Sequence, residues 1–489
     1  MTATEASAVA TAVRPMPEGH RLKAGSLGPV GIAFFVLAAA APMAAFVGAG
    51  PTTFSMIGPG VPLVYLVIAA VVALFSVGYL RMSRYVTSAA GFVAYIGRGL
   101  GTRAAGASAG IVIVTYIALQ LGFWAQFGVF ANQALVTYGG IDIPPWAWAF
   151  VFIAVTTVLS MYGVDMSLRV LGVILSLEVV VVVILLVGIL VHGVESPSFE
   201  SFSPSVFSSP GLGLAFLFVA GCFTTFEATT VFSEEARDPA RSIPVALYTV
   251  IGFIAVFYGV ASWIVSMALG PDNVQEAAAG NLSGIMFQLA RDNVGPWLEA
   301  SMQIMVVTSY LAMLLGMSNM FARYTFALSR AGILPKGLAV IGVRHTPARA
   351  SLVNGVVVAV LLAVFFACGA DPMVNIFAWS VALGTVGFLL IMAVSVAVLA
   401  FFLRRAGRGS RRGVGALFAT VIAPGASVIL LVGMLVFSIG NYDAMLLGDG
   451  GTAKLLLIAL PFAALLGAAA AHPSRNVSFT VNNTEKSFS

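Results

Sequence analysis

Ionisable residues are scarce in this chain of 489 residues. Lys, Arg, Asp and Glu make up 9% of it, hydrophobic residues make up 60%, and the mean hydropathy is +1.02. Soluble globular domains carry about 25% charged residues, so the composition excludes that class. Cysteine is nearly absent as well: Cys222 and Cys368 both lie in apolar segments, so we expect no disulfide framework.

The residue groupings that membrane enzymes and metal sites need are also missing. The four histidines are scattered at predicted loops and helix ends, so no metal constellation is expected. No Ser/His, paired-aspartate or metal grouping appears at one depth, which argues against lipid or peptide chemistry and against an enzyme. No cofactor motif is expected. A channel is disfavoured because the chain has no repeated filter-like loop.

What the chain has instead is long apolar runs. A membrane helix needs about 20 apolar residues, and on that criterion we predict an all-α integral membrane protein with twelve transmembrane helices. They lie near residues 29–56, 61–82, 104–131, 145–162, 167–192, 211–235, 246–269, 295–329, 350–368, 372–402, 413–438 and 451–471.

The basic residues predict the orientation of these helices. With the N-terminus in the cytoplasm, only Arg291 and Lys454 of the 24 Lys and Arg fall on the outer side. This asymmetry explains the net charge of +5 better than nucleic-acid binding does. We therefore expect a multi-pass plasma-membrane protein whose tails, 1–28 and 473–489, are cytoplasmic. Residues 1–28 are polar and mixed, so no cleavable signal peptide is expected.

Two of the predicted helices are interrupted at mid-membrane. In 211–235, the residues at mid-depth include Gly221, Thr224, Thr225 and Glu227, and an ionisable group at that depth costs roughly 2.5–3.5 kcal/mol. In 29–56, Pro42 removes a backbone donor. Pro42 alone could be a simple kink, but broken helices in corresponding positions of two halves indicate an inverted repeat with a binding site at the midplane.

That pairing predicts the domain organisation. The first repeat is 29–195, an extracellular loop is 196–210, the second repeat is 211–405, and the last two helices occupy 406–472.

Three segments carry a family resemblance. The segment FEATTVFSEEARDPARSIPVAL, residues 226–247, resembles the helix 6 signature of the amino acid–polyamine–organocation permeases. The segments ARYTFALSRAGILPKGLAVIGVRHTP at 322–347, and GPGVPLVYLVIAA with RMSRYVTSAAGFVAYIGRGLG at 58–101, are similar to other parts of these permeases. The resemblance covers nearly the whole chain and implies a LeuT-like fold, with five plus five helices in inverted repeats and two more. Thr225 replaces the family's usual glycine, which leaves the substrate open.

The helix breaks are the predicted binding site for the main-chain groups of a substrate. Half-helix ends expose N–H groups that suit a carboxylate and carbonyls that suit an ammonium, and an α-amino acid carries one of each. The alternative is that these side chains only fill the bundle. The candidate substrate-binding residues are Ala41, Pro42, Met43, Ala44, Ala45, Gln120, Phe223, Thr224, Thr225, Phe226 and Trp379.

Two acids within the membrane are candidates for proton coupling. Glu178 is the only ionisable group between Arg169 and His192, and hydrocarbon disfavours its charged form, so it could bind a proton near neutral pH. It also aligns roughly with a helix 5 position where several family members have a lysine implicated in proton coupling. The alternative for Glu178 is a static pair with a polar neighbour such as Gln120 or Ser318. Glu227 either meets a cationic group in the cavity or caps freed backbone, and the resemblance favours a structural or gating role.

Sodium coupling is the less favoured alternative. In related sodium-coupled transporters, helix 8 hydroxyls join helix 1 carbonyls. Here the expected depth holds Ala312 and Met313, with Thr308 and Ser309 a turn away. The sequence therefore predicts a permease that imports an amino acid or related organic amine by alternating access, as a symporter with protons. The alternatives are a diamine or polyamine permease, an exchanger, or a nutrient sensor of the same fold. The predicted cytoplasmic gate is Glu234, Glu235, Arg241 and Arg323.

Overall fold

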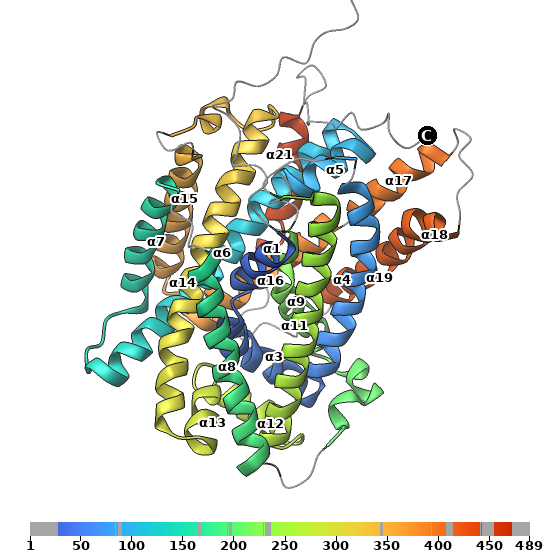
Figure 1. Cartoon of the computed structure of the whole chain (residues 1–489). Coiled ribbons are helices and arrows are strands. Elements are labelled where there is room, and N and C mark those ends of the chain that lie inside the picture. The colour runs from blue at the N-terminus through green and yellow to red at the C-terminus, as the bar shows by residue number, and fades with distance from the viewer. Residues whose placement is uncertain are drawn as a thin grey trace, which may run out of the picture.

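The computed structural model describes residues 28–83, 85–86, 90–163, 168–192, 194, 198–227, 229, 236–342, 346–392, 394–406, 414–440, 442 and 454–471. Within these ranges every regular element is a helix. Eight stretches are long and apolar enough to cross a membrane, and three shorter apolar helices accompany them. The predicted class, an all-helical multi-pass membrane protein, is confirmed. In Figure 1 the long helices run between one end, where α5 lies, and the opposite end, where α12 and α13 lie.

The first membrane segment is broken where proline predicts a break. Helix α1 (Pro29–Ala40) ends at Ala41, whose backbone is left-handed with φ 47° and ψ 72°. A residue before proline is disfavoured in the right-handed helical region, and Pro42 has no N–H to continue the ladder. The chain resumes as α2 (Pro42–Ala44), the π-helix η2 (Ala45–Ala49) and α3 (Gly50–Ile57).

The second interruption lies in the segment 211–235. Helix α9 (Leu212–Cys222) stops at Phe223, and the 3-10 helix η6 (Thr224–Glu227) follows. The Thr224 hydroxyl donates to the Gly221 carbonyl at 2.8 Å, which satisfies one of the carbonyls that the end of α9 leaves unpaired. Both breaks therefore lie at the polar or proline-bearing positions from which they were predicted.

The remaining elements form the bundle around these two breaks. They are η3 (Gly58–Gly60), α4 (Val61–Ser83), α5 (Gly91–Leu100), α6 (Thr102–Gly139), α7 (Pro145–Met161), α8 (Leu168–His192), η4 (Glu200–Phe202), η5 (Pro204–Ser208), α11 (Pro239–Leu269), α12 (Val274–Gly280), α13 (Ile285–Asn293), α14 (Pro296–Arg330), η8 (Lys336–Ala339), α15 (Ala348–Ala367), η9 (Pro372–Phe377), α16 (Ala378–Met392), α17 (Val394–Ala406), α18 (Val414–Leu417), η10 (Phe418–Ile422), α19 (Ala423–Gly440) and α21 (Ala459–Ala470).

Helix α6 packs backbone to backbone against α21. A Cβ added at Gly106 would collide with the Gly467 carbonyl, and one at Gly110 would collide with the Ala463 carbonyl. Small residues at a helix crossing in a membrane allow this close approach, and van der Waals contact then holds the pair. Helix α6 also contacts α16, α14 and α7, so it lies in the middle of the bundle.

Candidate functional site

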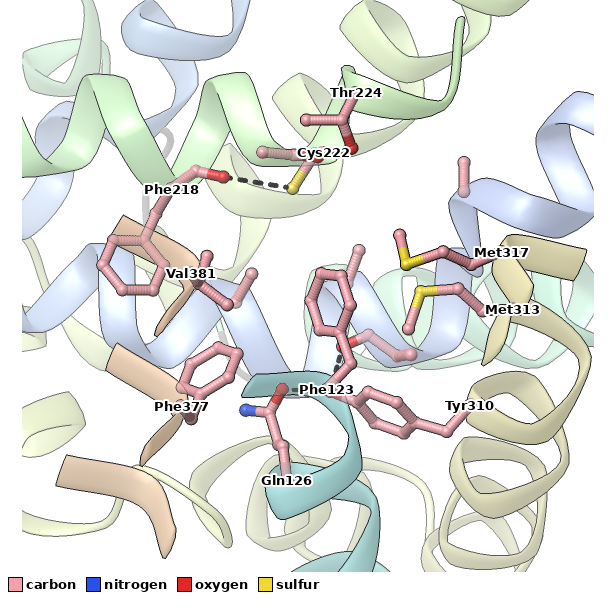
Figure 2. Close-up of a pocket in the computed structure, with 15 residues that line it drawn as sticks. Phe123, Gln126, Phe218, Cys222, Thr224, Tyr310, Met313, Met317, Phe377 and Val381 are labelled. Atoms are coloured by element: carbon pink, nitrogen blue, oxygen red, sulfur yellow. Dashed lines mark hydrogen bonds between the residues drawn. The ribbon is translucent and has the colours of Figure 1, made fainter. Parts of the chain in front are cut away.

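A cavity lies between the two broken helices. The space in it that is open to the centre of a water-sized molecule is about 40 Å³, and side chains from α6, α14 and the α16 region line it (Figure 2). Its lining residues are Ala40, Ala44, Ala45, Ala49, Phe123, Gln126, Phe218, Gly221, Cys222, Thr224, Tyr310, Met313, Met317, Phe377 and Val381. The break after α1 and the break after α9 thus meet at one space.

Among the described residues, the lining contains no charged side chain and few polar groups. The Tyr310 hydroxyl donates to Gln126 Oε1 and also lies 3.4 Å from the Ala44 carbonyl. Gln126 is only 1% exposed, yet its Nε2 has no hydrogen-bond partner among the described residues. Burying a polar group without a hydrogen-bond partner destabilises a protein by about 1–3 kcal/mol, so an unpaired amide in a cavity needs a physical reason.

Glu178 contacts the helix 1 break but does not line the cavity. It is 2% exposed, although Leu177 beside it on α8 is 48% exposed on the outer face of the bundle. Glu178 Oε2 accepts from the Met43 N–H at 3.1 Å and from the Ser309 hydroxyl at 3.0 Å. A carboxylate at the N-terminus of a half-helix satisfies free N–H groups and interacts favourably with the helix dipole.

The backbone donors at this break are therefore already engaged. Ala44 N lies 3.4 Å from Ser309 Oγ, Ala41 N donates to the Ala38 carbonyl, and Ala45 N donates to the Ala41 carbonyl. Since Pro42 has no N–H, every backbone donor from Ala41 to Ala45 has a protein acceptor. In this structure the N–H groups expected to receive a substrate carboxylate hold Glu178 and Ser309 instead.

The profile of the family described as Amino acid permease matches residues 31–479. This chain belongs to that family. The resemblance stated from the sequence is therefore confirmed: the family is one of transporters.

Individual relatives match only part of the chain, at moderate sequence identity. The L-asparagine permease of Salmonella typhimurium is 27% identical over 325 residues, which is 62% of this chain and 61% of that one. The branched-chain amino acid permease of Lactococcus lactis is 25% identical over 346 residues, 65% of this chain and 70% of that one. An uncharacterized transporter of Mycobacterium tuberculosis is 36% identical over 152 residues, 31% of this chain and 32% of that one. The chain thus spans under two thirds of the asparagine permease.

Solved structures share the fold at low sequence identity. MhsT in complex with L-phenylalanine matches with a TM-score of 0.51 and 14% identity, covering 82% of this chain and 98% of that one. A Na+-coupled sialic acid symporter matches with a TM-score of 0.50 and 12% identity, covering 86% and 92%. These likenesses show a LeuT-type fold for the permease.

The second membrane acid, Glu227, lies at a different junction. Its Oε2 accepts from the Tyr116 hydroxyl at 2.5 Å, and its Oε1 lies 3.5 Å from Phe92 N at the start of α5. The Tyr324 hydroxyl also hydrogen-bonds to Glu227. Glu227 does not line the cavity. It joins η6 to α5, α6 and α14, which favours the structural or gating reading over contact with a cationic substrate.

Several predicted site residues lie elsewhere in the permease. Gln120 exchanges hydrogen bonds with Asn354 at 2.9 and 3.2 Å, and Ser318 donates to it at 3.4 Å. Gln120 and Ser318 therefore bond elsewhere, and the polar neighbour that pairs with Glu178 is Ser309. Of the candidate substrate-binding residues, Ala44, Ala45 and Thr224 line the cavity; Ala41, Pro42, Met43, Gln120, Phe223, Phe226 and Trp379 do not, and the side chain of Thr225 lies outside the described residues.

The predicted cytoplasmic gate is described only in part. Glu234 and Glu235 lie outside the described residues. Arg241 is exposed near the start of α11, and Arg323 is half-buried on α14. The pairing of this cluster across the inner surface stays a prediction.

The expectation about hydroxyls near helix 1 needs correction. Ser309 was expected a turn away from the relevant depth, but its hydroxyl meets both Glu178 and the helix 1 break. The error came from the register of α14, which a sequence alone leaves uncertain by several residues. No grouping of three or more His, Cys, Asp or Glu is found in the ranges described above.

Sequence reasoning missed Gln126 as a site residue. Phe123 and Gln126 are three residues apart on α6, so they share a face, and that face is the one turned to the cavity. Phe218, Phe377 and Val381 were missed because apolar residues in an apolar helix give no signal of which side faces the cavity. A polar residue at mid-depth, as Gln126 is, was the one available signal.

Proposed function

We propose that this permease imports an amino acid across the plasma membrane by alternating access, with a proton as the coupled ion and Glu178 as the acid that binds it. The observation that supports this is the contact between Glu178 and the helix 1 break, with Met43 N at 3.1 Å and Ser309 Oγ at 3.0 Å. An acid that holds the broken helix links its own protonation to the position of that helix.

The physical step is a change in hydrogen-bond strength. An ionised carboxylate makes hydrogen bonds roughly twice as strong as a neutral acceptor does. Protonation of Glu178 would weaken its hold on the Met43 N–H and the Ser309 hydroxyl. The helix 1 break would then be free to rearrange, and loss of the proton on the other side of the membrane would restore the original contact.

The topology proposed for this cycle has twelve spans. The apolar stretch Pro29–Ser83 contains α1 to α3 and also α4, which η3 separates, so it accounts for two spans. Counted that way, the eight apolar stretches and the three shorter helices correspond to the twelve predicted spans. Each proposed repeat, 29–195 and 211–405, opens with a broken helix, and the distribution of basic residues supports a cytoplasmic location for both termini.

The alternatives differ in what the cavity should contain. A diamine or polyamine would call for carboxylates facing the ligand, and neither Glu178 nor Glu227 lines the cavity. An exchanger or a sensor would use the same cavity without a proton gradient. Transport assays separate these cases.

The test is uptake of labelled amino acids and diamines into proteoliposomes, with inward gradients of protons or sodium. Glu178→Gln should abolish accumulation driven by a proton gradient and keep exchange of internal for external substrate. Glu276→Gln is the control, because Glu276 is exposed on α12. Full accumulation by Glu178→Gln, or accumulation driven by sodium alone, would refute the proton mechanism. Accumulation of diamines in place of amino acids would refute the substrate class.

A further inference from the structure

One donor group in the cavity has no acceptor. Gln126 Oε1 is occupied by the Tyr310 hydroxyl, so both hydrogens of Nε2 remain available. Figure 2 shows the Gln126 nitrogen on the side away from Tyr310, toward Phe377. The side chain is held on α6, which is fixed by its contacts with several other helices.

The other side-chain donors of the lining are engaged. Thr224 and Cys222 each donate to a backbone carbonyl of their own chain segment, at 2.8 and 3.6 Å. The Tyr310 hydroxyl is bound to Gln126. The backbone donors of the helix 1 break bond to Glu178, Ser309 or carbonyls of the same segment. Among the described lining residues, the Gln126 amide is thus the side-chain donor left for an anionic group.

The cavity also presents negative partial charge from two helix ends. Helix α1 ends at Ala40 and α9 ends at Cys222, and both residues line the cavity. The last carbonyls of a helix lack helical partners and carry the negative end of the dipole. These two ends suit an ammonium group, and Gln126 suits a carboxylate.

The rest of the wall is apolar. Phe123, Phe218, Phe377 and Val381 face the cavity on one side, with two methionines of α14 on the other. The described part of the lining has no charged side chain that could pair with a charged group of the ligand. A buried charge without a partner is strongly disfavoured, and an amide side chain would also need hydrogen bonds that this wall lacks.

We infer that the cavity selects zwitterionic α-amino acids with uncharged, apolar side chains, and that the Gln126 amide donates to their carboxylate. This inference rests on the proposed amino acid transport. It favours substrates of the leucine and phenylalanine kind over asparagine, lysine or glutamate.

The first test is competition for uptake in proteoliposomes of the full-length permease. Leucine and phenylalanine should compete about tenfold or more better than asparagine, lysine or glutamate. Accumulation of asparagine or lysine with no uptake of leucine would overturn the apolar selectivity and leave amino acid transport standing. If no amino acid accumulated, the proposed function itself would fail.

The second test separates the carboxylate from the ammonium. Binding is measured as ligand-dependent thermal stabilisation of the purified permease, with leucine and with isoamylamine, which is leucine without its carboxylate. Gln126→Met should weaken leucine binding by about 10- to 100-fold, the range for a lost hydrogen bond to a charged group, and leave isoamylamine binding unchanged. Tyr310 keeps the Ala44 carbonyl as an acceptor, so this variant leaves no orphaned hydroxyl.

Gln133→Met is the matched control, because Gln133 is on the same helix and does not line the cavity. Gln126→Glu, which keeps an acceptor for Tyr310 but removes the amide donor, should repeat the loss for leucine. Melting temperatures without ligand show whether each variant is folded. Equal binding of leucine by both Gln126 variants and the wild type would refute the role of the amide. A loss confined to isoamylamine would show that Gln126 serves the ammonium instead.

Discussion

Replacing Ser309 by Ala should destabilise the permease most when Glu178 carries its charge. The Ser309 hydroxyl donates to Glu178 Oε2 at 3.0 Å, and both side chains are buried. A hydrogen bond to a charged group is worth about 1.5–3 kcal/mol, whereas one between neutral groups is worth about 0.5–1.5 kcal/mol. The bond to Ala44 N is long, at 3.4 Å, and should add little.

A double-mutant cycle measures this difference. Ser309→Ala should cost about 1 kcal/mol more in the wild type than in the Glu178→Gln background, a factor of about five in the unfolding equilibrium. The assay is unfolding of the purified protein in detergent, followed across a series of pH values. The extra cost is present while Glu178 is ionised, so it should disappear as the pH falls and Glu178 takes up a proton.

Ser301→Ala is the control, because Ser301 lies on the same helix and its hydroxyl bonds to the Trp297 carbonyl. Its cost should be the same in both backgrounds and at each pH. Identical costs for Ser309→Ala in both backgrounds, within about 0.3 kcal/mol, would mean that the two groups do not interact. An extra cost that grew toward acid pH would reverse the sign and refute the reasoning.

Two further predictions concern other contacts of the bundle. Gly110→Val should lower the melting temperature by an amount equivalent to about 1–3 kcal/mol, because the new side chain would meet the α21 backbone. Gly433→Val is the control, since Gly433 has open space around it. Equal melting curves for the two variants would contradict the close packing of α6. Tyr116→Phe removes one hydrogen bond to Glu227 and should lower the maximal rate of uptake with little change in KM, because Glu227 does not line the cavity. Tyr138→Phe, at an exposed position, is the control. A rise in KM alone would argue that Glu227 acts on the substrate.

The sequence predicts positions along the chain better than directions around a helix. Pro42 marks the first break because its missing N–H and its restriction of Ala41 are local properties. Gln120 and Gln126 show the opposite case. Both are polar residues at depth on one helix, six residues apart, and their directions differ by about 120° around its axis. Only the packing of neighbouring helices decides that Gln126 faces the cavity and that Gln120 faces Asn354.

The same limit applies to Glu178. Its burial follows from its chemistry, because a carboxyl group on a lipid-facing helix turns toward the protein. Its partners depend on the depth of α14 relative to α8, and a shift of one turn would replace Ser309 by another residue. Hydropathy fixes helix ends to within a few residues, which is too coarse to place a hydroxyl within 3.0 Å of a carboxylate.

The glycine contacts between α6 and α21 have a mechanical consequence. Because Gly106 and Gly110 rest against the backbone of α21, neither helix can slide along the other by even one residue, a rise of about 1.5 Å, without a steric clash. Helix α6 is therefore held in place along its axis, and two of its residues, Phe123 and Gln126, line the cavity. The opposite wall of the cavity, at Ala44 and Thr224, belongs to segments whose helices are discontinuous. Any ligand held between the two walls thus bridges a stiff part of the molecule and a compliant one.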